Sequence, residues 1–235
     1  MIGADETVVV IGGSSGIGLA VARRAAAQGA RVVIIGREKT KLQAAVSTIG
    51  PSARGEAVDA LDRAALAEFF QKLGPFNHLV LAASGGRGAG AFRELDGDGL
   101  RAGFEAKFWA QWNAAQAALP TLQPAGSMVF ITAASSRLAN PGTSGLAAVN
   151  GALERMVVTL ARELAPIRVN AVSPGVIDTG WWDDKPAGLF ESSYGKAPLA
   201  RPGQPDEVAD AVLFLMGNAF ITGVILDVDG GLHLT

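Results

Sequence analysis

The sequence predicts an α/β domain in which helices cover both faces of a parallel sheet. Short runs of Val, Ile and Leu alternate along the whole chain with longer segments whose apolar residues recur at three- and four-residue spacing. The short runs are apolar throughout rather than at every second position, as expected of strands that are buried on both faces. The chain has 235 residues, of which 49% are hydrophobic, and this is enough for one substantial core.

Taken in order, the pattern gives seven strands separated by helices. The expected strands cover residues 7–11, 31–35, 55–58, 78–81, 127–131, 167–172 and 224–228. Helical spacing is clearest over residues 17–28, 61–73 and 205–216. Residues 108–136 carry no charge but contain three glutamines, an asparagine and two prolines, which indicates a buried helix followed by a strand rather than a membrane span.

No linker divides the chain, so we expect a single domain over residues 1–235. The longest irregular stretch covers about residues 180–202 and contains Trp181, Trp182 and Tyr194. A loop of this length in a compact domain is typically a lid or a binding loop. We therefore predict a substrate lid over this stretch.

Composition excludes several classes of function. The formal net charge is −2, so we expect neither nucleic acid nor membrane as a partner, but a small-molecule substrate. The chain has no cysteine, which excludes disulfides, thiol nucleophiles and cysteine-ligated metals. Residues 1–6 are acidic and lack the basic region of a signal peptide, which predicts a cytoplasmic protein.

A glycine-rich loop, Gly12-Gly13-Ser14-Ser15-Gly16-Ile17-Gly18, follows the first expected strand and leads into a helix. Glycines allow the backbone to turn tightly and to approach a pyrophosphate, which the N–H groups and the dipole at the helix start attract. Gly18 has no side chain, so the helix can pack closely on the strand. The loop predicts dinucleotide binding, and a simple turn is the alternative.

The end of the second expected strand predicts which dinucleotide binds. Arg37 lies 19 residues after Gly18, near the offset of about 20 residues at which an acidic residue would bind a ribose 2′-hydroxyl. A guanidinium instead fits a 2′-phosphate, which its fork of donors can hold. We therefore predict NADP(H) as cofactor. The alternative is that Arg37 is an exposed arginine at a strand end.

With segments elsewhere, this loop makes the sequence resemble the short-chain dehydrogenase/reductase family. Residues 11–18 are similar to its T-G-x-x-x-G-x-G motif, with Ile11 in place of threonine, and residues 170–179 to its N-x-x-x-P-G-x-x-x-T segment. Residues 222–231 resemble its closing strand. The resemblance covers essentially the whole chain. It implies a doubly wound Rossmann fold, NADP(H)-dependent oxidoreductase activity and a homodimer or homotetramer.

The resemblance also implies a set of cofactor contacts. Asp59 stands where the family's aspartate contacts adenine, and Ile177 and Thr179 stand where the nicotinamide carboxamide is held. The family's N-N-A-G is replaced by Leu81-Ala82-Ala83-Ser84. The predicted cofactor-binding residues are Gly12, Ser14, Ser15, Gly16, Ile17, Arg37, Asp59, Ala82, Ala83, Ser84, Lys107, Pro174, Gly175, Ile177 and Thr179.

The family's catalytic residues do not carry over. Aligned on Pro141-Gly142, its tyrosine, lysine, serine and asparagine positions hold Leu146, Asn150, Ala133 and Lys107. Neither Leu146 nor Ala133 can transfer a proton, so any acid must be a non-standard one. The only tyrosine is Tyr194, in the predicted lid.

We hypothesise that lysine and asparagine have exchanged helices, so that Lys107 reaches the nicotinamide ribose from the opposite wall. A lysine desolvated there could also serve as an acid; the alternative is an ordinary lysine on a helix surface. The other catalytic candidates are Thr132, Arg137, Asn150 and Tyr194, with Arg137 a candidate to bind an anionic substrate group. The favoured function is hydride transfer to or from a small carbonyl or alcohol. The alternatives are an inactive NADP(H)-binding sensor or partner protein, and an enzyme of another class.

Overall fold

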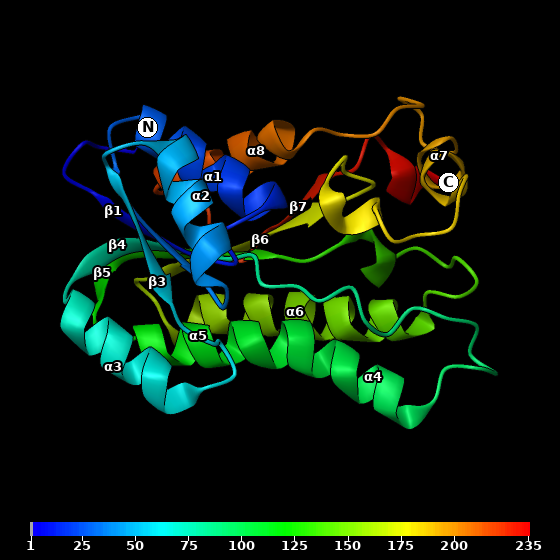
Figure 1. The fold of residues 1–235 in the computed structure, drawn as a ribbon, viewed down its shortest axis with the longest axis horizontal. Helices are drawn as coiled ribbons and strands as arrows, with labels where there is room; N and C mark the ends of the chain where they lie inside the picture. Colours follow the sequence, from blue (N-terminus) through cyan, green and yellow to red (C-terminus); the bar gives the residue numbers. More distant parts are fainter. Residues whose placement is uncertain (1) are drawn as a thin grey trace.

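The computed structural model describes residues 2–235 and contains one seven-stranded sheet in the order β3-β2-β1-β4-β5-β6-β7, with every neighbouring pair parallel (Figure 1). The strands are β1 Thr7–Ile11, β2 Arg31–Gly36, β3 Ala53–Ala57, β4 Phe76–Leu81, β5 Leu122–Ile131, β6 Arg168–Pro174 and β7 Ile225–Val228. The predicted doubly wound α/β fold is confirmed.

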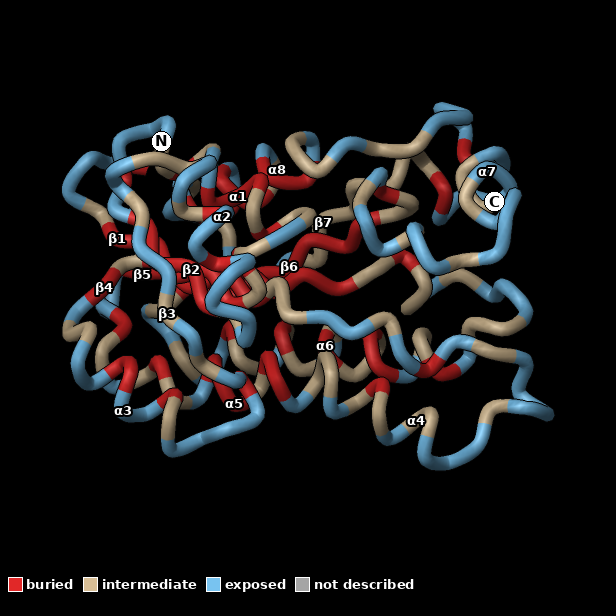
Figure 2. Tube along the Cα trace, in the orientation of Figure 1, coloured by how far each residue is buried: buried red, intermediate tan, exposed pale blue. Residues whose placement is uncertain are grey.

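Helices lie on both faces of the sheet. The helices α1 Gly16–Ala27, α2 Lys39–Ile49 and α8 Pro205–Gly217 cover one face, and α3 Arg63–Leu73, α5 Ala110–Ala118 and α6 Ser144–Glu163 cover the other (Figure 1). In β1, Val8 and Val10 pack toward the first set of helices, whereas Val9 and Ile11 pack toward the second. Because both sets of side chains are buried, the strand is apolar at every position. Figure 2 shows the buried residues concentrated in the sheet.

Strands β3 and β5 begin before their expected ranges. β3 lies at the edge and exposes Arg54 and Gly55, so the apolar pattern that marks central strands is missing there, and the strand begins two residues before the expected range. β5 begins at Leu122, five residues early, because Leu122 pairs with Phe76. Among residues 2–235, no helix is both long enough and apolar enough to cross a membrane.

The sheet has its topological switch point between β1 and β4. From β1 the chain proceeds outward through β2 and β3, and it then returns to the other side of β1 and proceeds outward through β5, β6 and β7. At such a point the connections after neighbouring strands diverge and leave a crevice at the carboxyl ends of the strands, where ligands bind.

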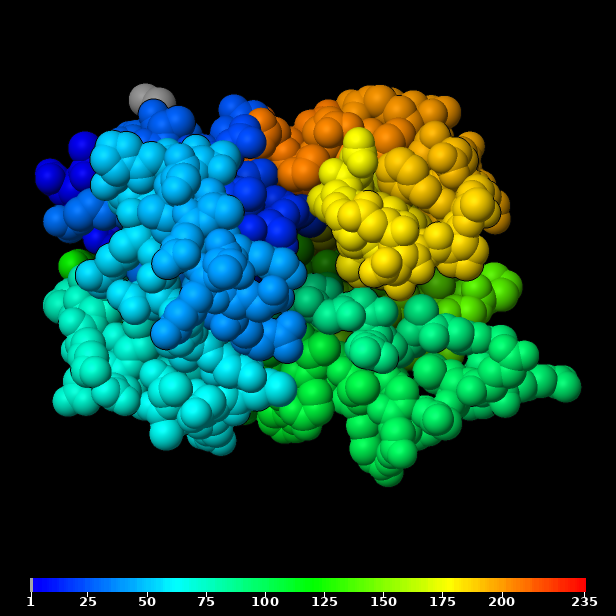
Figure 3. Space-filling view, viewed as in Figure 1, coloured from blue at the N-terminus to red at the C-terminus, as the bar shows by residue number. Residues whose placement is uncertain are grey.

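The segment predicted as a lid lies over this end of the sheet. It is not irregular throughout, because it contains a 3₁₀ turn at Gly180–Trp182 and the short helix α7 Leu189–Tyr194. In Figure 3 these residues, coloured yellow to orange, stand across a hollow from the blue residues near the N-terminus.

Candidate functional site

Two adjoining cavities lie along the carboxyl ends of the strands. The smaller, of about 540 Å³, is formed around the glycine-rich loop and the ends of β1, β2 and β4. The larger, of about 680 Å³, lies under the lid at the ends of β5 and β6. Ser84, Gly85, Thr179 and Trp181 line both cavities, so the two form one continuous trough.

The glycine-rich loop has a conformation that only glycine allows. Gly12 has a φ of +81°, in the left-handed region that side chains disfavour. A Cβ on Gly18 would lie 2.2 Å from the carbonyl oxygen of Gly12. The first turn of α1 can therefore pack directly on the loop, and its N–H groups face the smaller cavity where a phosphate would lie.

Arg37 and Ser14 line the smaller cavity together. Arg37 is exposed, and within residues 2–235 it makes no ion pair. A Cβ on Gly36 would lie 3.4 Å from Ser14 Oγ, so the glycine leaves room beside that hydroxyl. A guanidinium and a hydroxyl around a small residue fit a 2′-phosphate.

Lys41 is a further cation of this cavity that the sequence analysis missed. It lies in the first turn of α2, and its Nζ is 2.8 Å from Glu38 Oε1. The sequence signal for Lys41 was its position four residues after Arg37. A helix that starts just after a strand places the side chains of its first turn beside the end of that strand. Asp59 also lines the cavity, and its Oδ1 accepts a hydrogen bond from the Leu61 N–H at 3.0 Å.

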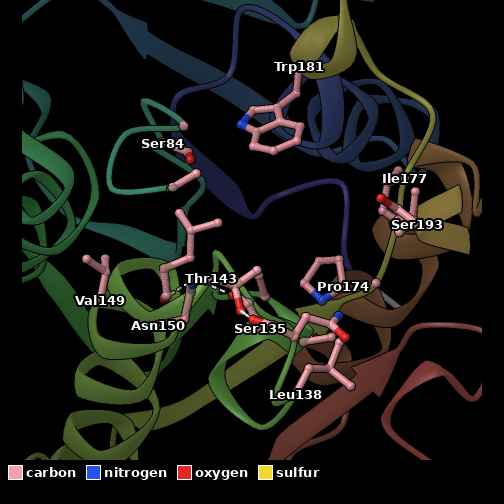
Figure 4. Close-up of a pocket in the computed structure, with 18 of the residues that line it drawn as sticks. Ser84, Ser135, Leu138, Thr143, Val149, Asn150, Pro174, Ile177, Trp181 and Ser193 are labelled. Atoms are coloured by element: carbon pink, nitrogen blue, oxygen red, sulfur yellow. Dashed lines mark hydrogen bonds between the residues drawn. The ribbon is translucent and has the colours of Figure 1, made fainter. Parts of the chain in front are cut away.

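The remaining predicted cofactor residues are also brought to the trough. Gly12, Ser14, Ser15, Gly16, Ile17, Ala82 and Ala83 line the smaller cavity, and Lys107, Pro174, Gly175 and Ile177 line the larger one. Figure 4 shows Pro174 and Ile177 on one side of the larger cavity, and Trp181 and Ser84 at its junction with the smaller one.

Lys107 enters the larger cavity from a π-helical turn. This turn, Phe104–Trp109, joins helix α4 Gly97–Gly103 to α5. Such turns are frequent at functional sites because the wider backbone re-aims a side chain. Lys107 Nζ donates a hydrogen bond to the Thr132 carbonyl oxygen at 2.9 Å, which excludes the surface-lysine alternative. Burial lowers the pKa of Lys107 to about 8, and the negative charge of Glu154 opposes this effect.

Glu154 is a site residue that the sequence analysis missed. Its Oε1 accepts hydrogen bonds from Thr132 Oγ1 at 2.9 Å and from Ser136 Oγ at 2.8 Å, and its side chain is only 11% exposed. Thr132 therefore contacts Lys107 through its backbone and Glu154 through its side chain. The available signal was a carboxylate four residues after Asn150, on the buried side of a helix.

Asn150 lines the larger cavity and carries a buried acceptor without a partner. It is 3% exposed, and its Nδ2 donates to the Leu146 carbonyl oxygen at 2.9 Å and to Ser135 Oγ at 3.1 Å (Figure 4). Its Oδ1 has no partner within the described chain. Since buried polar atoms are almost always hydrogen-bonded, this oxygen is an unsatisfied acceptor just behind the cavity wall.

Two of the catalytic candidates lie outside both cavities. Arg137 forms an ion pair with Asp227 of β7, and its Nε lies 3.9 Å from Glu154 Oε2. The charge of Arg137 is thus compensated by two carboxylates outside the cavities. Tyr194 packs on the Phe190 ring at a centroid distance of 5.2 Å and lines neither cavity. Thr132 and Asn150 do line the larger cavity.

Comparison with known proteins gives matches over nearly the whole chain. A family model described as enoyl-(acyl carrier protein) reductase matches residues 11–233. The Mus musculus 3-oxoacyl-[acyl-carrier-protein] reductase is 35% identical over 239 residues, which cover 98% of this chain and 99% of that protein. The Danio rerio carbonyl reductase family member 4 is also 35% identical, over 98% of this chain and 99% of its own.

Solved structures of known proteins also match this chain over nearly its whole length. A small-chain dehydrogenase in complex with NADPH has a TM-score of 0.85 and 30% identity, covering 98% of this chain and 100% of that one. A short-chain type dehydrogenase/reductase from Mycobacterium ulcerans has a TM-score of 0.90 and 27% identity, covering 100% of this chain and 92% of that one. The glycine-rich loop, the strand order and these matches lead to one assignment: the chain belongs to the short-chain dehydrogenase/reductase family.

Proposed function

We propose that this chain is an NADP(H)-dependent oxidoreductase that acts on a small carbonyl or alcohol and uses Lys107 as its proton donor. NADP(H), when bound along the trough, supplies or accepts the hydride. The observation that carries the proposal is the placement of Lys107 Nζ in the wall of the larger cavity, 2.9 Å from the Thr132 carbonyl oxygen at the end of β5.

The usual proton donor of the family is missing at its position. The tyrosine and serine positions hold Leu146 and Ala133, and both line the larger cavity with apolar side chains. The lysine and asparagine positions hold Asn150 and Lys107, which line the same cavity from α6 and from the π-helical turn. The family's two polar groups are thus both available, with their helices exchanged.

Lys107 has the properties that an acid at this position needs. An ammonium has three donors, and the Thr132 carbonyl occupies one, which leaves two for a ribose hydroxyl and a substrate oxygen. A pKa of about 8 keeps the group protonated at neutral pH and still acidic enough to release its proton as an alkoxide develops. In reduction, the carbonyl carbon gains the hydride, its oxygen takes the Lys107 proton, and solvent restores that proton.

Asn150 and Glu154 complete the arrangement. Asn150 lines the larger cavity, and a small rotation of its amide would expose the unpaired Oδ1 to a ribose hydroxyl and so position the cofactor. Glu154 holds Thr132 through its hydroxyl, and its charge supports the ammonium of Lys107. Selection of NADP(H) over NAD(H) rests on Arg37, with Ser14 and Lys41 beside it in the smaller cavity.

The proposal includes the architecture around the site. Residues 1–235 act as one domain, and residues 180–202 close over the substrate. A Cβ on Gly86 would lie 2.5 Å from Trp181 Nε1, so the lid contacts the opposite wall of the trough at a glycine.

The assembly is a homodimer or homotetramer. β7 lies at a sheet edge, and the nearby side chains of Phe214 and Phe220 are 53% and 101% exposed. A second copy of the chain would cover this apolar surface.

Deuterium transfer tests this function. The protein is incubated with 4-deuterated NADPH and a panel of carbonyl compounds, and the products are analysed for label. We expect transfer by the natural chain, a loss of about 10²- to 10⁴-fold in turnover for Lys107→Ala, as for removal of a general acid, and no change for Lys72→Ala, an exposed residue of α3. Tight NADPH binding without transfer to any compound would favour the sensor function instead. Unchanged turnover and NADPH affinity in Lys107→Ala would exclude Lys107 as the donor.

A further inference from the structure

The larger cavity has an unusual balance of charge. Its lining contains three cations, Arg87, Lys107 and Lys196, and no Asp or Glu side chain. The chain as a whole has 22 acidic and 20 basic residues, so the bias belongs to this cavity and not to the composition. A cavity lined by three cations and by no acidic side chain, with the carboxylate of Thr235 as the one opposing group, raises the local concentration of anions and disfavours cationic ligands.

The smaller cavity shows that the cofactor alone does not account for this bias. Around the expected position of the cofactor phosphates, Arg37 and Lys41 are accompanied by Glu38, Asp59 and Glu105. The wall without Asp or Glu is therefore confined to the half of the trough under the lid, beyond the phosphates. Its cations are placed to meet a ligand other than the dinucleotide phosphates.

Arg87 and Lys196 are available to such a ligand. Both are exposed, and within residues 2–235 neither forms an ion pair or a side-chain hydrogen bond. Arg87 lies in the loop after β4, which packs on α4 so closely that a Cβ on Gly103 would be 3.0 Å from the Arg87 carbonyl oxygen. Lys196 follows α7 in the lid. The two cations thus come from the loop after β4 and from the lid, whereas Lys107 donates to Thr132 and is assigned to the reacting oxygen in the proposed function.

The rest of the cavity suits an apolar body. The lining includes the apolar side chains of Leu138, Leu146, Val149, Trp182, Leu189 and Leu232. A volume of about 680 Å³ falls within the range of small-molecule sites, which combine a mostly apolar wall with a few polar groups that set orientation.

We propose that the substrate is an amphiphilic anion: a carbonyl compound whose apolar chain lies between Leu146 and Leu189, and whose carboxylate or phosphate is bound by Arg87 and Lys196. The inference rests on the proposed function for the reaction, but the binding can be measured without turnover. The sequence analysis named Arg137 as the candidate to bind an anionic group, but Arg137 is paired with Asp227. The inference assigns this role to Arg87 and Lys196, which line the cavity.

Calorimetry on the NADPH-saturated protein tests the binding with three probes of one chain length: decanoate, decyl phosphate and decanol. We expect both anions to bind at least tenfold more tightly than decanol, with an affinity that falls at high salt because exposed charges are screened. The double variant Arg87→Gln/Lys196→Gln should lose that advantage and leave decanol binding unchanged. Lys72→Gln should change nothing. Comparison of decanoate with decyl phosphate identifies which oxyanion the site prefers.

Equal affinity for decanol and the anions, or an equal loss for all three probes in the double variant, would overturn the inference. A second measurement compares kcat/KM for 10-oxodecanoate and decanal, and the anionic aldehyde should be preferred in the natural chain only. If the anions bind through Arg87 and Lys196 but neither aldehyde is reduced, the binding inference stands and the proposed reaction fails. If both aldehydes are reduced without preference for the anion, the proposed reaction stands and the binding inference fails.

Discussion

The Lys107 Nζ atom lies 2.9 Å from the Thr132 carbonyl oxygen, and the Thr132 hydroxyl lies 2.9 Å from Glu154 Oε1. A partly buried cation and a partly buried carboxylate are therefore connected through one residue at the carboxyl end of β5. Opposite charges in a poorly solvated site stabilise each other's charged forms. The pKa of Lys107 should accordingly depend on Glu154, although the two side chains make no direct ion pair within the described chain.

The pH dependence of carbonyl reduction should follow the protonation of Lys107. Its pKa of about 8 predicts that kcat falls as the pH rises through 8, since the donor must carry its proton. Glu154 raises this pKa, so Glu154→Gln should shift the fall to lower pH. Rate profiles from pH 6 to 10 check this, with Glu68→Gln on the exposed face of α3 as control. Identical profiles for Glu154→Gln and the natural chain would contradict the connection.

Arg37→Ala should weaken NADPH binding by about tenfold to a hundredfold, the loss expected for hydrogen bonds to a charged group. NADH binding should not change, because NADH lacks the 2′-phosphate. Titration calorimetry with NADPH and NADH measures the ratio of the two affinities. Arg54→Ala on the exposed strand β3 removes a charge of the same sign away from the cavity and should leave both affinities unchanged. A preserved preference for NADPH in Arg37→Ala would remove Arg37 from the site.

Lys107→Met should stabilise the fold while it removes activity. Burial lowers the pKa of Lys107 from 10.5 to about 8, so below pH 8 the folded chain bears the cost of a buried ammonium. Between pH 8 and 10.5 the folded chain loses this proton before the unfolded chain does, and the cost disappears. The variant should thus melt higher by about 2–4 °C at pH 7, with a smaller difference at pH 10. A lower melting temperature at pH 7 would mean that the charge stabilises the fold.

Gly18→Ala should destabilise the protein by about 2–4 kcal/mol, a typical cost of overpacking a closed site. The new Cβ would lie 2.2 Å from the Gly12 carbonyl oxygen, so the loop must move and NADPH affinity should fall with stability. Gly151→Ala on α6 is the matched control, because a Cβ there meets nothing within 4 Å and alanine is the better helix former. Urea unfolding gives both free energies; equal stability of the two variants would show that the loop is not rigid.

The fold and the cofactor half of the site could be predicted because their signals are local. The apolar runs define the central strands, and the loop from Gly12 to Gly18 encodes its own conformation. β3 gave a weaker signal, since an edge strand need not be apolar. The proton chemistry could not be predicted in the same way. Arg137 is neutralised by Asp227, 90 residues away, and Glu154 meets Thr132 only after β5 and α6 have packed together.

The connection through Thr132 also constrains how this chain could have diverged from relatives with the usual residues. A lysine at position 107 without Glu154 would be a desolvated ammonium that lacks its compensating negative charge. Glu154 without Lys107 would still have Arg137 Nε at 3.9 Å. Lys107 is therefore the costlier half, so we expect descendants of one ancestor that keep Lys107 to keep Glu154 as well.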